Sequence, residues 1–442
     1  PNQKMNGMKS GWASAVTKRI HQQRPTAIGL LISICVLKLR AEASDTGSKA
    51  VTTFCTEKAY AQAILHQLSQ WRIKTAAAAK EQAAEQTLLE LAAARYANTP
   101  EGPAYQALAA LAREIAQNTA AAAQRAAEDV DAAQTLLSAR MAELSVVEAI
   151  RSGKITAGTA GTRTASALGV LTSGQAQHCA TTGAITLAAA TDCKAESEAV
   201  NRAGQVGTEL ERLQSLKVRK PRDLRTVTIN IGMEVKGTVN AGAGNYVDLA
   251  GVPGCGNNGE GTATADATNA FAAKLSLPKA TFHAADLKIQ AESGEGNQKK
   301  SQTDLSNVAL LTADEDLQNA MQKAVAAKPQ IQKKVSERTL SALISETAVS
   351  DFAEGLAMAK SKGKTEHLKP TEVAKLLFGG ENTDVKAVFI DKLIKDTTAI
   401  TNGEQKIEGT TADLRKNNFS KAVAYFYSKN MKKDSQYSRN KA

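Results

Sequence analysis

The hundred residues from Val51 to Ile150 predict one long helical hairpin. Between Ala59 and Tyr96 the chain consists mainly of Ala, Gln, Glu, Lys and Leu and contains no Gly or Pro, a composition that favours helix. The segment Asn98–Pro103 then contains two prolines and a glycine, which are typical of a turn. A second helix is expected from Ala104 to about Arg151. Because the linker is short, the two helices are expected to lie antiparallel.

Apolar residues recur along both helices at spacings of three and four, which places them on one face of each helix. Gln82 and Glu85 interrupt the stripe on the first helix. Globular helices average about 11–12 residues. At 1.5 Å per residue each of these would span roughly 60–70 Å, which favours a rod over an ordinary bundle. The stripe comprises Ile64, Leu68, Trp71, Ala78, Leu89, Ala92 and Tyr96 on the first helix and Leu108, Leu111, Ile115, Leu137, Met141 and Leu144 on the second.

Residues 1–43 have the pattern of a secretory signal peptide. Lys and Arg residues precede a mainly apolar run at 25–37, and Ala41 and Ala43 supply the small residues of a cleavage site. The apolar run is short for a membrane span, so a retained anchor is the weaker alternative. We therefore expect cleavage near Ala43 and a secreted chain.

The net charge of +11 is concentrated at the two ends of the chain. Residues 1–43 contain seven Lys/Arg and one Glu, and residues 429–442 contain five Lys/Arg and one Asp. The body between them is close to neutral. A basic protein can bind nucleic acid or an acidic membrane, but here the charge lies in a leader and a tail. We therefore predict no nucleic-acid partner.

Four cysteines remain once the leader is removed, and an even number in a secreted chain predicts two disulfides. Three connectivities are possible. No CxxC pair is present, so the spacing matches no zinc pattern, and we predict no metal site. The four residues are Cys55, Cys179, Cys193 and Cys255.

Residues 152–300 are expected to form a lobe of short strands and loops. The best strand candidate lies within Arg222–Val247, where apolar and polar residues alternate. Residues 251–261 and 292–303 are rich in Gly and polar residues and are expected to be loops. The alternating apolar residues of the strand candidate are Val227, Ile229 and Ile231.

Helical periodicity returns over residues 314–428. A break at Gly379–Gly380 precedes a last long helix, expected from Asp384 to about Tyr427 and weakened at Gly403 and Gly409. These segments are expected to return along the hairpin.

The predicted fold class is mainly α. Residues 44–428 form one domain, in which a long antiparallel helical hairpin (51–150), a coiled-coil rod, carries the inserted lobe of short strands and loops (152–300). The returning helices (314–428) complete the domain, and residues 429–442 form a basic polar tail.

A search for catalytic chemistry finds no complete constellation. Gly254–Gly259 matches GxGxxG formally, but the sequence after it is a poor helix start, so a surface loop is the better interpretation. The histidines have no partner at ligand spacing, and the acidic run Asp314–Asp316 is typical of a helix N-terminus. We predict that the chain is not an enzyme and needs no cofactor.

One N-glycosylation sequon is present, at Asn418-Phe419-Ser420. In a secreted chain an occupied sequon marks an exposed face. Asn418 is therefore the predicted glycan site.

With these segments placed, the chain resembles the N-terminal domain of a trypanosome variant surface glycoprotein of class A. The resemblance covers most of the chain after the leader and rests on the early cysteine, Cys55, followed by two long Ala-, Gln- and Glu-rich helices. The most specific match is near the C-terminus, at residues 375–400 (KLLFGGENTDVKAVFIDKLIKDTTAI) and 421–430 (KAVAYFYSKN).

The resemblance implies a homodimeric coat glycoprotein on the outer leaflet of the plasma membrane. Such a protein shields the membrane, exposes variable loops to host antibodies and supports antigenic variation and immune evasion. The resemblance also implies a Cys55–Cys179 and a Cys193–Cys255 disulfide. A Cys-rich C-terminal domain and a GPI anchor are expected from the family, with residues 429–442 beginning the linker to that domain.

Two other functions remain open from the sequence. The first is a receptor or serum-protein-binding module on the same scaffold, as in the related transferrin-receptor and serum-resistance proteins. The second is a generic secreted coiled-coil protein. Abundance at the cell surface and saturable binding of a serum protein distinguish the coat from the receptor.

Overall fold

The computed structural model describes residues 46–160, 164–165, 177–178, 181–194, 197–236, 247–249, 252–257, 269–278, 282–290, 310–361 and 367–439. The expected signal peptide and the polar loop predicted at 292–303 lie outside the described residues. Contacts divide the chain into Pro1–Asp45 and Thr46–Ala442.

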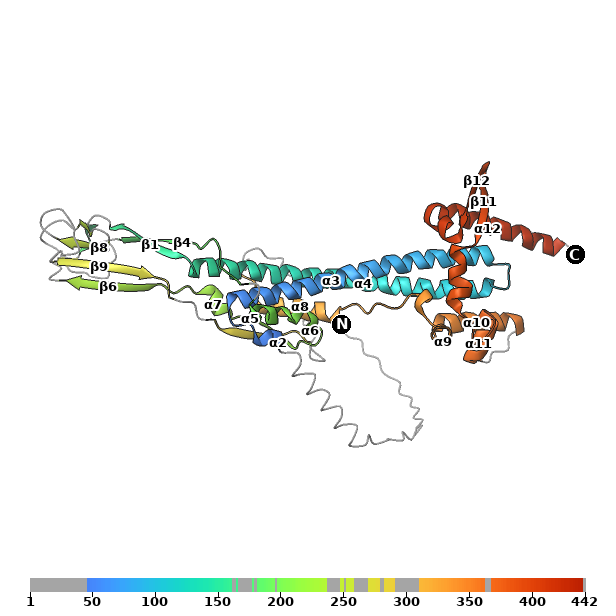
Figure 1. Ribbon diagram of the computed structural model, residues 1–442, viewed down its shortest axis with the longest axis horizontal. Helices are drawn as coiled ribbons and strands as arrows, with labels where there is room; N and C mark the ends of the chain where they lie inside the picture. The colour runs from blue at the N-terminus through green and yellow to red at the C-terminus, as the bar shows by residue number, and fades with distance from the viewer. Residues whose placement is uncertain are drawn as a thin grey trace, which may run out of the picture. The chain divides into compact units, whose positions relative to one another are not determined.

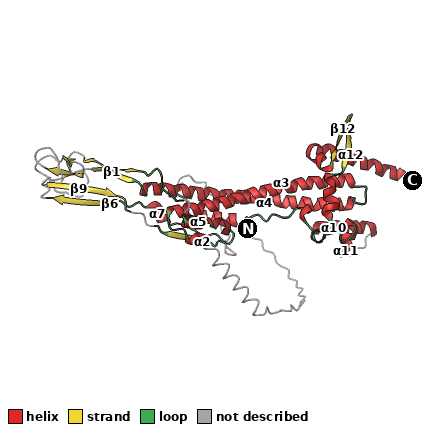
Figure 2. Cartoon of the chain, viewed as in Figure 1, coloured by secondary structure: helices red, strands yellow, loops and turns green. Residues whose placement is uncertain are grey.

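Two long helices, α3 (Phe54–Tyr96) and α4 (Gly102–Arg151), pack along each other as the predicted hairpin (Figure 1). Helix α3 begins five residues before Ala59, because Thr53 and Thr56 form a reciprocal cap. The Thr53 hydroxyl accepts from the Thr56 N–H at 3.3 Å, and the Thr56 hydroxyl accepts from the Thr53 N–H at 3.0 Å. Helix predominates in the described residues (Figure 2), so the predicted mainly-α fold class is confirmed.

The polar interruption of the α3 stripe is a docking point for another segment. Gln82 is buried, and its side-chain amide donates to the Gln332 carbonyl at 2.7 Å. The Glu85 carboxylate accepts from the Val335 and Ser336 N–H groups at 2.7 and 2.9 Å. These bonds fix the 3-10 turn η2 (Val335–Glu337) against the middle of the hairpin.

One hydrophobic core lies toward the open end of the hairpin. Buried residues of α3 and α4, among them Ile64, Leu68 and Leu137, contact a layer of shorter elements. In that layer β5 and β10 pair antiparallel, from Ala284↔Arg219 to Lys288↔Ser215. The layer comprises α2 (Thr46–Lys49), α5 (Glu198–Gly204), α6 (Val206–Glu209), β5 (Ser215–Arg219), β10 (Ala284–Lys288) and α8 (Asp314–Ala326).

The strand lobe follows directly from the end of α4. Strand β1 (Lys154–Ala160) pairs antiparallel with β4 (Thr181–Thr186), and β2 (Thr164–Ala165) pairs with β3 (Gln177–His178). A four-stranded antiparallel sheet has the order β6-β9-β8-β7. Its strands are β6 (Asn230–Lys236), β7 (Val247–Leu249), β8 (Val252–Asn257) and β9 (Asn269–Ser276).

One local prediction in this lobe is wrong and another is confirmed in part. The loop expected at 251–261 is strand β8 over Val252–Asn257, because pairing with β7 on one side and β9 on the other outweighs the low strand propensity of its glycines. The strand predicted within Arg222–Val247 is present as β6 and includes Ile231, but it begins only at Asn230, after the short helix α7 (Pro221–Arg225), so Val227 and Ile229 lie before it.

A second core lies at the closed end of the hairpin. The Tyr105 hydroxyl donates to the Phe389 carbonyl at 3.0 Å, and Leu108 and Phe378 are buried beside it. Gly379 ends α11 in the left-handed conformation, with φ of 81°, which places the predicted helix break correctly. The packed elements are α9 (Leu340–Ile344), α10 (Thr347–Ser361), α11 (Pro370–Phe378), a π-helical turn η3 (Lys386–Ile390) and a 3-10 turn η4 (Asp391–Ile394).

The last long helix predicted from Asp384 is wrong over its middle third. Residues Thr397–Asn402 (β11) and Gln405–Thr410 (β12) form a hairpin in which Ile400 faces Ile407. Gly403 takes φ of 64° in the two-residue turn, a conformation that glycine adopts without strain. Helix α12 (Thr411–Arg439) follows, so the tail expected at 429–442 begins inside a helix.

Within the described part of the chain, no helix combines the length and the apolar character needed to cross a membrane.

Candidate functional site

The disulfide of the structure joins Cys55, in the first turn of α3, to Cys193. The Cα atoms are 5.2 Å apart, which suits a disulfide. The Cys55–Cys179 and Cys193–Cys255 pairings implied by the resemblance are therefore both wrong, because each uses one cysteine of this bridge. The Ala188 N–H donates to the Ala149 carbonyl at 2.9 Å, which holds the segment after β4 beside the end of α4 and brings Cys193 to Cys55. Cys179 lies outside the described residues, and Cys255 lies in β8.

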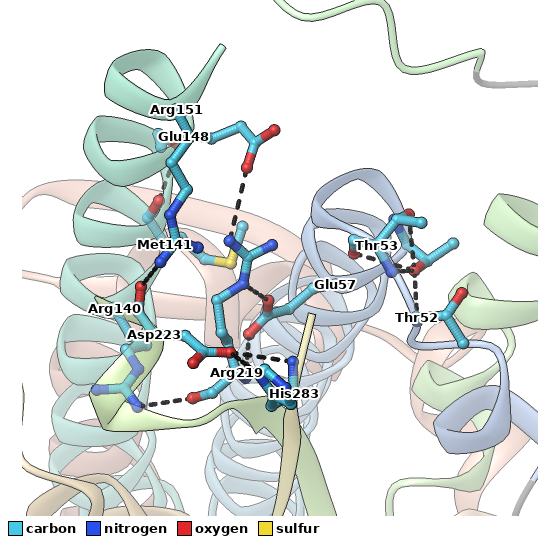
Figure 3. A network of polar contacts seen from close by, with 12 residues as sticks. Thr52, Thr53, Glu57, Arg140, Met141, Glu148, Arg151, Arg219, Asp223 and His283 are labelled. Carbon is cyan, nitrogen blue, oxygen red and sulfur yellow. Dashed lines mark hydrogen bonds and ion pairs between the residues drawn. The ribbon is translucent and has the colours of Figure 1, made fainter. Parts of the chain in front are cut away.

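A buried ion network lies next to this disulfide, at the open end of the hairpin. Arg219 of β5 is 3% exposed and lies between two carboxylates, those of Glu57 on α3 and Glu148 on α4 (Figure 3). Glu57 accepts from the Arg219 backbone N–H at 2.7 Å, and the two side chains approach to 3.6 Å. Glu148 lies 3.5 Å from the Arg219 guanidinium. One arginine thus connects both helices of the hairpin to β5.

Arg140 connects the same region of α4 to α8. Its guanidinium contacts the Asp314 carboxylate at 2.5 Å and donates to the Thr312 carbonyl at 2.8 Å. A further bond of 3.3 Å reaches the Arg219 carbonyl. Asp314, interpreted from the sequence as a helix N-terminal acid, does occupy the first turn of α8 and is also half of this ion pair.

Burial sets the electrostatics of the network. Loss of water raises the pKa of the Glu57 carboxyl above its ordinary value, and the hydrogen bond and positive charge of Arg219 oppose this only in part. The network as a whole consists of two buried arginines and three carboxylates. Their ion pairs connect α3, α4, β5 and α8.

A cavity of about 530 Å³ lies beside the network, between the end of α4 and α7. Asp223 of α7 is buried, and its Oδ2 accepts from the His283 backbone N–H at 3.0 Å and lies 2.8 Å from Nδ1 of the same residue. The polar lining comprises Arg151, Arg222, Asp223, Thr226, Thr228, Asn230 and His283.

Other polar residues singled out by the sequence do not join this site. His66 is exposed on α3, and His367 contacts Glu354 at 3.1 Å on the surface. Asn418 is half-buried in α12, at a point where the backbone leaves helical geometry (φ −141°, ψ 29°), and it stays a predicted glycan site. Among the residues that the structure describes, no three His, Cys, Asp or Glu side chains come together as metal ligands.

One feature of the sequence indicates the ion network, namely an arginine within an apolar stripe. Arg140 lies between Leu137 and Leu144 at the three–four spacing of the α4 stripe, where a core-facing position is normally apolar. An arginine at such a position requires a buried acidic partner. The partner itself, Asp314, is distant in sequence and could not be identified from spacing.

No family model matches the chain, and no curated protein matches its sequence. Solved structures do match. A structure described as variant surface glycoprotein VSGsur bound to suramin has a TM-score of 0.66 and 20% sequence identity, covering 87% of this chain and 99% of its own. A second structure of VSGsur has a TM-score of 0.58 and 20% sequence identity, and the match covers 87% of this chain and 99% of that chain. A structure of variant surface glycoprotein VSG13 has a TM-score of 0.52 and 11% sequence identity, and the match covers 86% of this chain and 99% of that chain. The fold of this chain is that of the variant surface glycoproteins.

Proposed function

We propose that the chain is a coat glycoprotein of a trypanosome surface, which shields the plasma membrane and supports antigenic variation and evasion of host immunity. The observation that carries the proposal is the fold match along almost the whole of VSGsur. A match confined to the helical hairpin would support only a generic coiled coil. Here 87% of this chain is covered, far more than the 43 and 50 residues of α3 and α4.

The physical properties of the hairpin suit a shielding role. Helices α3 and α4 contain 43 and 50 residues, so at 1.5 Å per residue they are about 65 and 75 Å long. A paired helical rod of that length fills a thick surface layer with little protein volume. The proposed role requires no catalytic chemistry.

The proposal includes three partners. Host antibodies would meet the strand lobe, residues 152–300, which carries the variable loops. A second copy of the chain would form a homodimer, which sedimentation equilibrium tests by measuring twice the mass of the processed chain. A GPI anchor would hold the dimer on the outer leaflet.

Antibody access on living cells tests this arrangement. Two sets of Fab fragments are raised against the purified protein, one mapped to strands β1–β9 and one to residues 335–393 at the closed end of the hairpin. We expect the first set to label intact cells uniformly and the second to bind only after lysis, because a dense coat covers the membrane-proximal part. Failure of both sets to label intact cells would contradict the proposed function.

A further inference from the structure

The cavity beside Asp223 has a positively charged anchor in Arg151, the last residue of α4. One nitrogen of its guanidinium, Nη2, donates to the carbonyl of Asp223 (Figure 3) and to that of Thr226, which fix the side chain. The other, Nη1, is buried and finds no acceptor among the described residues. A buried donor without an acceptor costs free energy. Because Nη1 is buried away from solvent, Arg151 contributes positive charge to the cavity through its position in the lining.

The charge of the lining is positive. Arg222 is 73% exposed and adds a second guanidinium at the cavity. Asp223 is the one carboxylate in the described lining, and it is already held by His283 and lies 3.7 Å from Arg222 Nε. The two guanidinium groups carry two positive charges and the carboxylate carries one negative charge, so the described lining has a net positive charge.

Neutral hydrogen-bonding groups complete the lining. Thr226, Thr228 and Asn230 line the cavity, and all three are exposed. The His283 ring uses Nδ1 toward Asp223, which leaves Nε2 for a ligand or water. Val227, Leu277 and Pro278 are the apolar part of the described lining. Because seven of the ten described lining residues are polar or charged, the cavity suits a polar ligand.

The electrostatics agree with an anionic occupant. Burial and the neighbouring Arg219 lower the pKa of the Arg151 guanidinium, against the opposing effects of Asp223 and Glu148. The folded protein therefore disfavours the charged form of Arg151, and an anion in the cavity would favour it. Guanidinium groups bind oxyanions with paired, charge-assisted hydrogen bonds.

We propose that this cavity, formed by Arg151, Arg222, Thr228 and His283, binds a small oxyanion of the phosphate class, as the free ion or as a monoester. The site is independent of the proposed coat function, because it concerns one chain and needs neither a membrane nor a second copy.

Calorimetric titration of the full chain with inorganic phosphate, and separately with glycerol 3-phosphate, tests the site and distinguishes the two forms of ligand. We expect saturable binding of one ligand per chain. Arg222→Gln should weaken it by about tenfold or more, the effect of losing one charge-assisted hydrogen bond. Because Arg222 is exposed, this variant should keep the melting temperature of the parent.

Arg225→Gln is the matched control, since Arg225 lies on the same short helix, is exposed and is absent from the cavity lining. It should leave the affinity unchanged. Thr228→Val provides a neutral test of the same site and should also weaken binding. Absence of saturable binding for both probes, or equal weakening by Arg222→Gln and Arg225→Gln, would overturn the proposal.

Discussion

At the scale of single residues, buried arginines determine how the hairpin is joined to its neighbours. Arg140 has a side chain only 4% exposed, and it satisfies Asp314 and two backbone carbonyls at once. Removing one partner of a buried ion pair leaves the others desolvated and unpaired. The free energy of unfolding should therefore depend strongly on this residue and weakly on surface arginines.

Arg140→Ala should lower the free energy of unfolding by about 3 kcal/mol, measured by urea denaturation. The matched control is Arg72→Ala, which removes a pair with Asp131 whose side chains are 50% and 52% exposed. A surface pair contributes at most about 1 kcal/mol, so this variant should change little. Equal losses in the two variants would show that Arg140 has no special role.

Two tyrosines should make the fold sensitive to alkali. Burial raises the pKa of the Tyr105 phenol, and burial together with a 2.7 Å hydrogen bond to Asp396 raises that of Tyr96. In the unfolded chain both ionise near pH 10, the ordinary tyrosine value, which is about 10. Their contribution to stability is therefore complete below about pH 10 and is lost as the pH rises toward the higher folded values.

The double variant Tyr96→Phe, Tyr105→Phe should lose less stability than the parent between about pH 9 and pH 11, around the ordinary tyrosine pKa. Urea denaturation midpoints measured across that range give the slope of stability against pH. Tyr427→Phe, at a position 66% exposed, should leave the slope as in the parent. A slope unaffected by the double variant would mean that other groups control alkaline unfolding.

At the scale of elements, the sequence predicts the long helices well and the short strands poorly. The two helices and their turn are determined by residues close together in the sequence, through helix-favouring composition, apolar spacing and the Pro and Gly residues of the turn. Strand β8 depends on two partners elsewhere in the chain, and the β11–β12 hairpin has good helix formers on both sides. The Thr-rich alternation from Thr397 and the turn at Gly403 were the available signals for that hairpin.

The candidate site could be predicted only in part for the same reason. Arg140 is visible as a charge in an apolar stripe, but the cavity combines the end of α4 with residues 222–230 and 277–283. No spacing rule joins residues that far apart. The disulfide shows the same limit, since the number of cysteines was informative and their pairing was not.

The turn of the long hairpin depends on the absence of a side chain at Gly102. A Cβ there would lie 2.6 Å from the Tyr96 carbonyl oxygen and 2.7 Å from that of Ala97. Gly102→Ala should therefore destabilise the fold by about 1–3 kcal/mol, the typical cost of overpacking. Gly204→Ala, at the end of α5 with no atom within 4 Å of the added Cβ, should be neutral or slightly stabilising. Thermal unfolding should show a lower melting temperature for Gly102→Ala than for Gly204→Ala. Equal melting temperatures would contradict this prediction.

The disulfide joins α3 to a segment 138 residues later. The double variant Cys55→Ser, Cys193→Ser should lose about 2–5 kcal/mol of stability, as removal of a native disulfide typically does. Peptide mapping without reductant should recover Cys55 linked to Cys193. We further predict that Cys179 and Cys255 form the second bridge. Recovery of a Cys55–Cys179 peptide would instead restore the pairing implied by the sequence resemblance.

At the scale of the whole molecule, one architecture accounts for the sequence pattern and for the structural match. The two long helices provide length, the first core joins them to α5, α6, β5, β10 and α8, and the second core closes the other end of the hairpin. The match to VSGsur extends over 99% of that chain despite 20% identity. The fold is therefore retained although most of the residues differ.

The measurement that tests the coat function most directly is the number of copies on living cells that express this chain. Surface proteins are labelled with a membrane-impermeant biotin reagent, quantified by mass spectrometry and compared before and after treatment with a phospholipase that cleaves GPI anchors. The proposed function predicts that this chain dominates the labelled proteins and is released by the enzyme. A minor surface species that binds a serum protein saturably, or a chain absent from the surface, would contradict it.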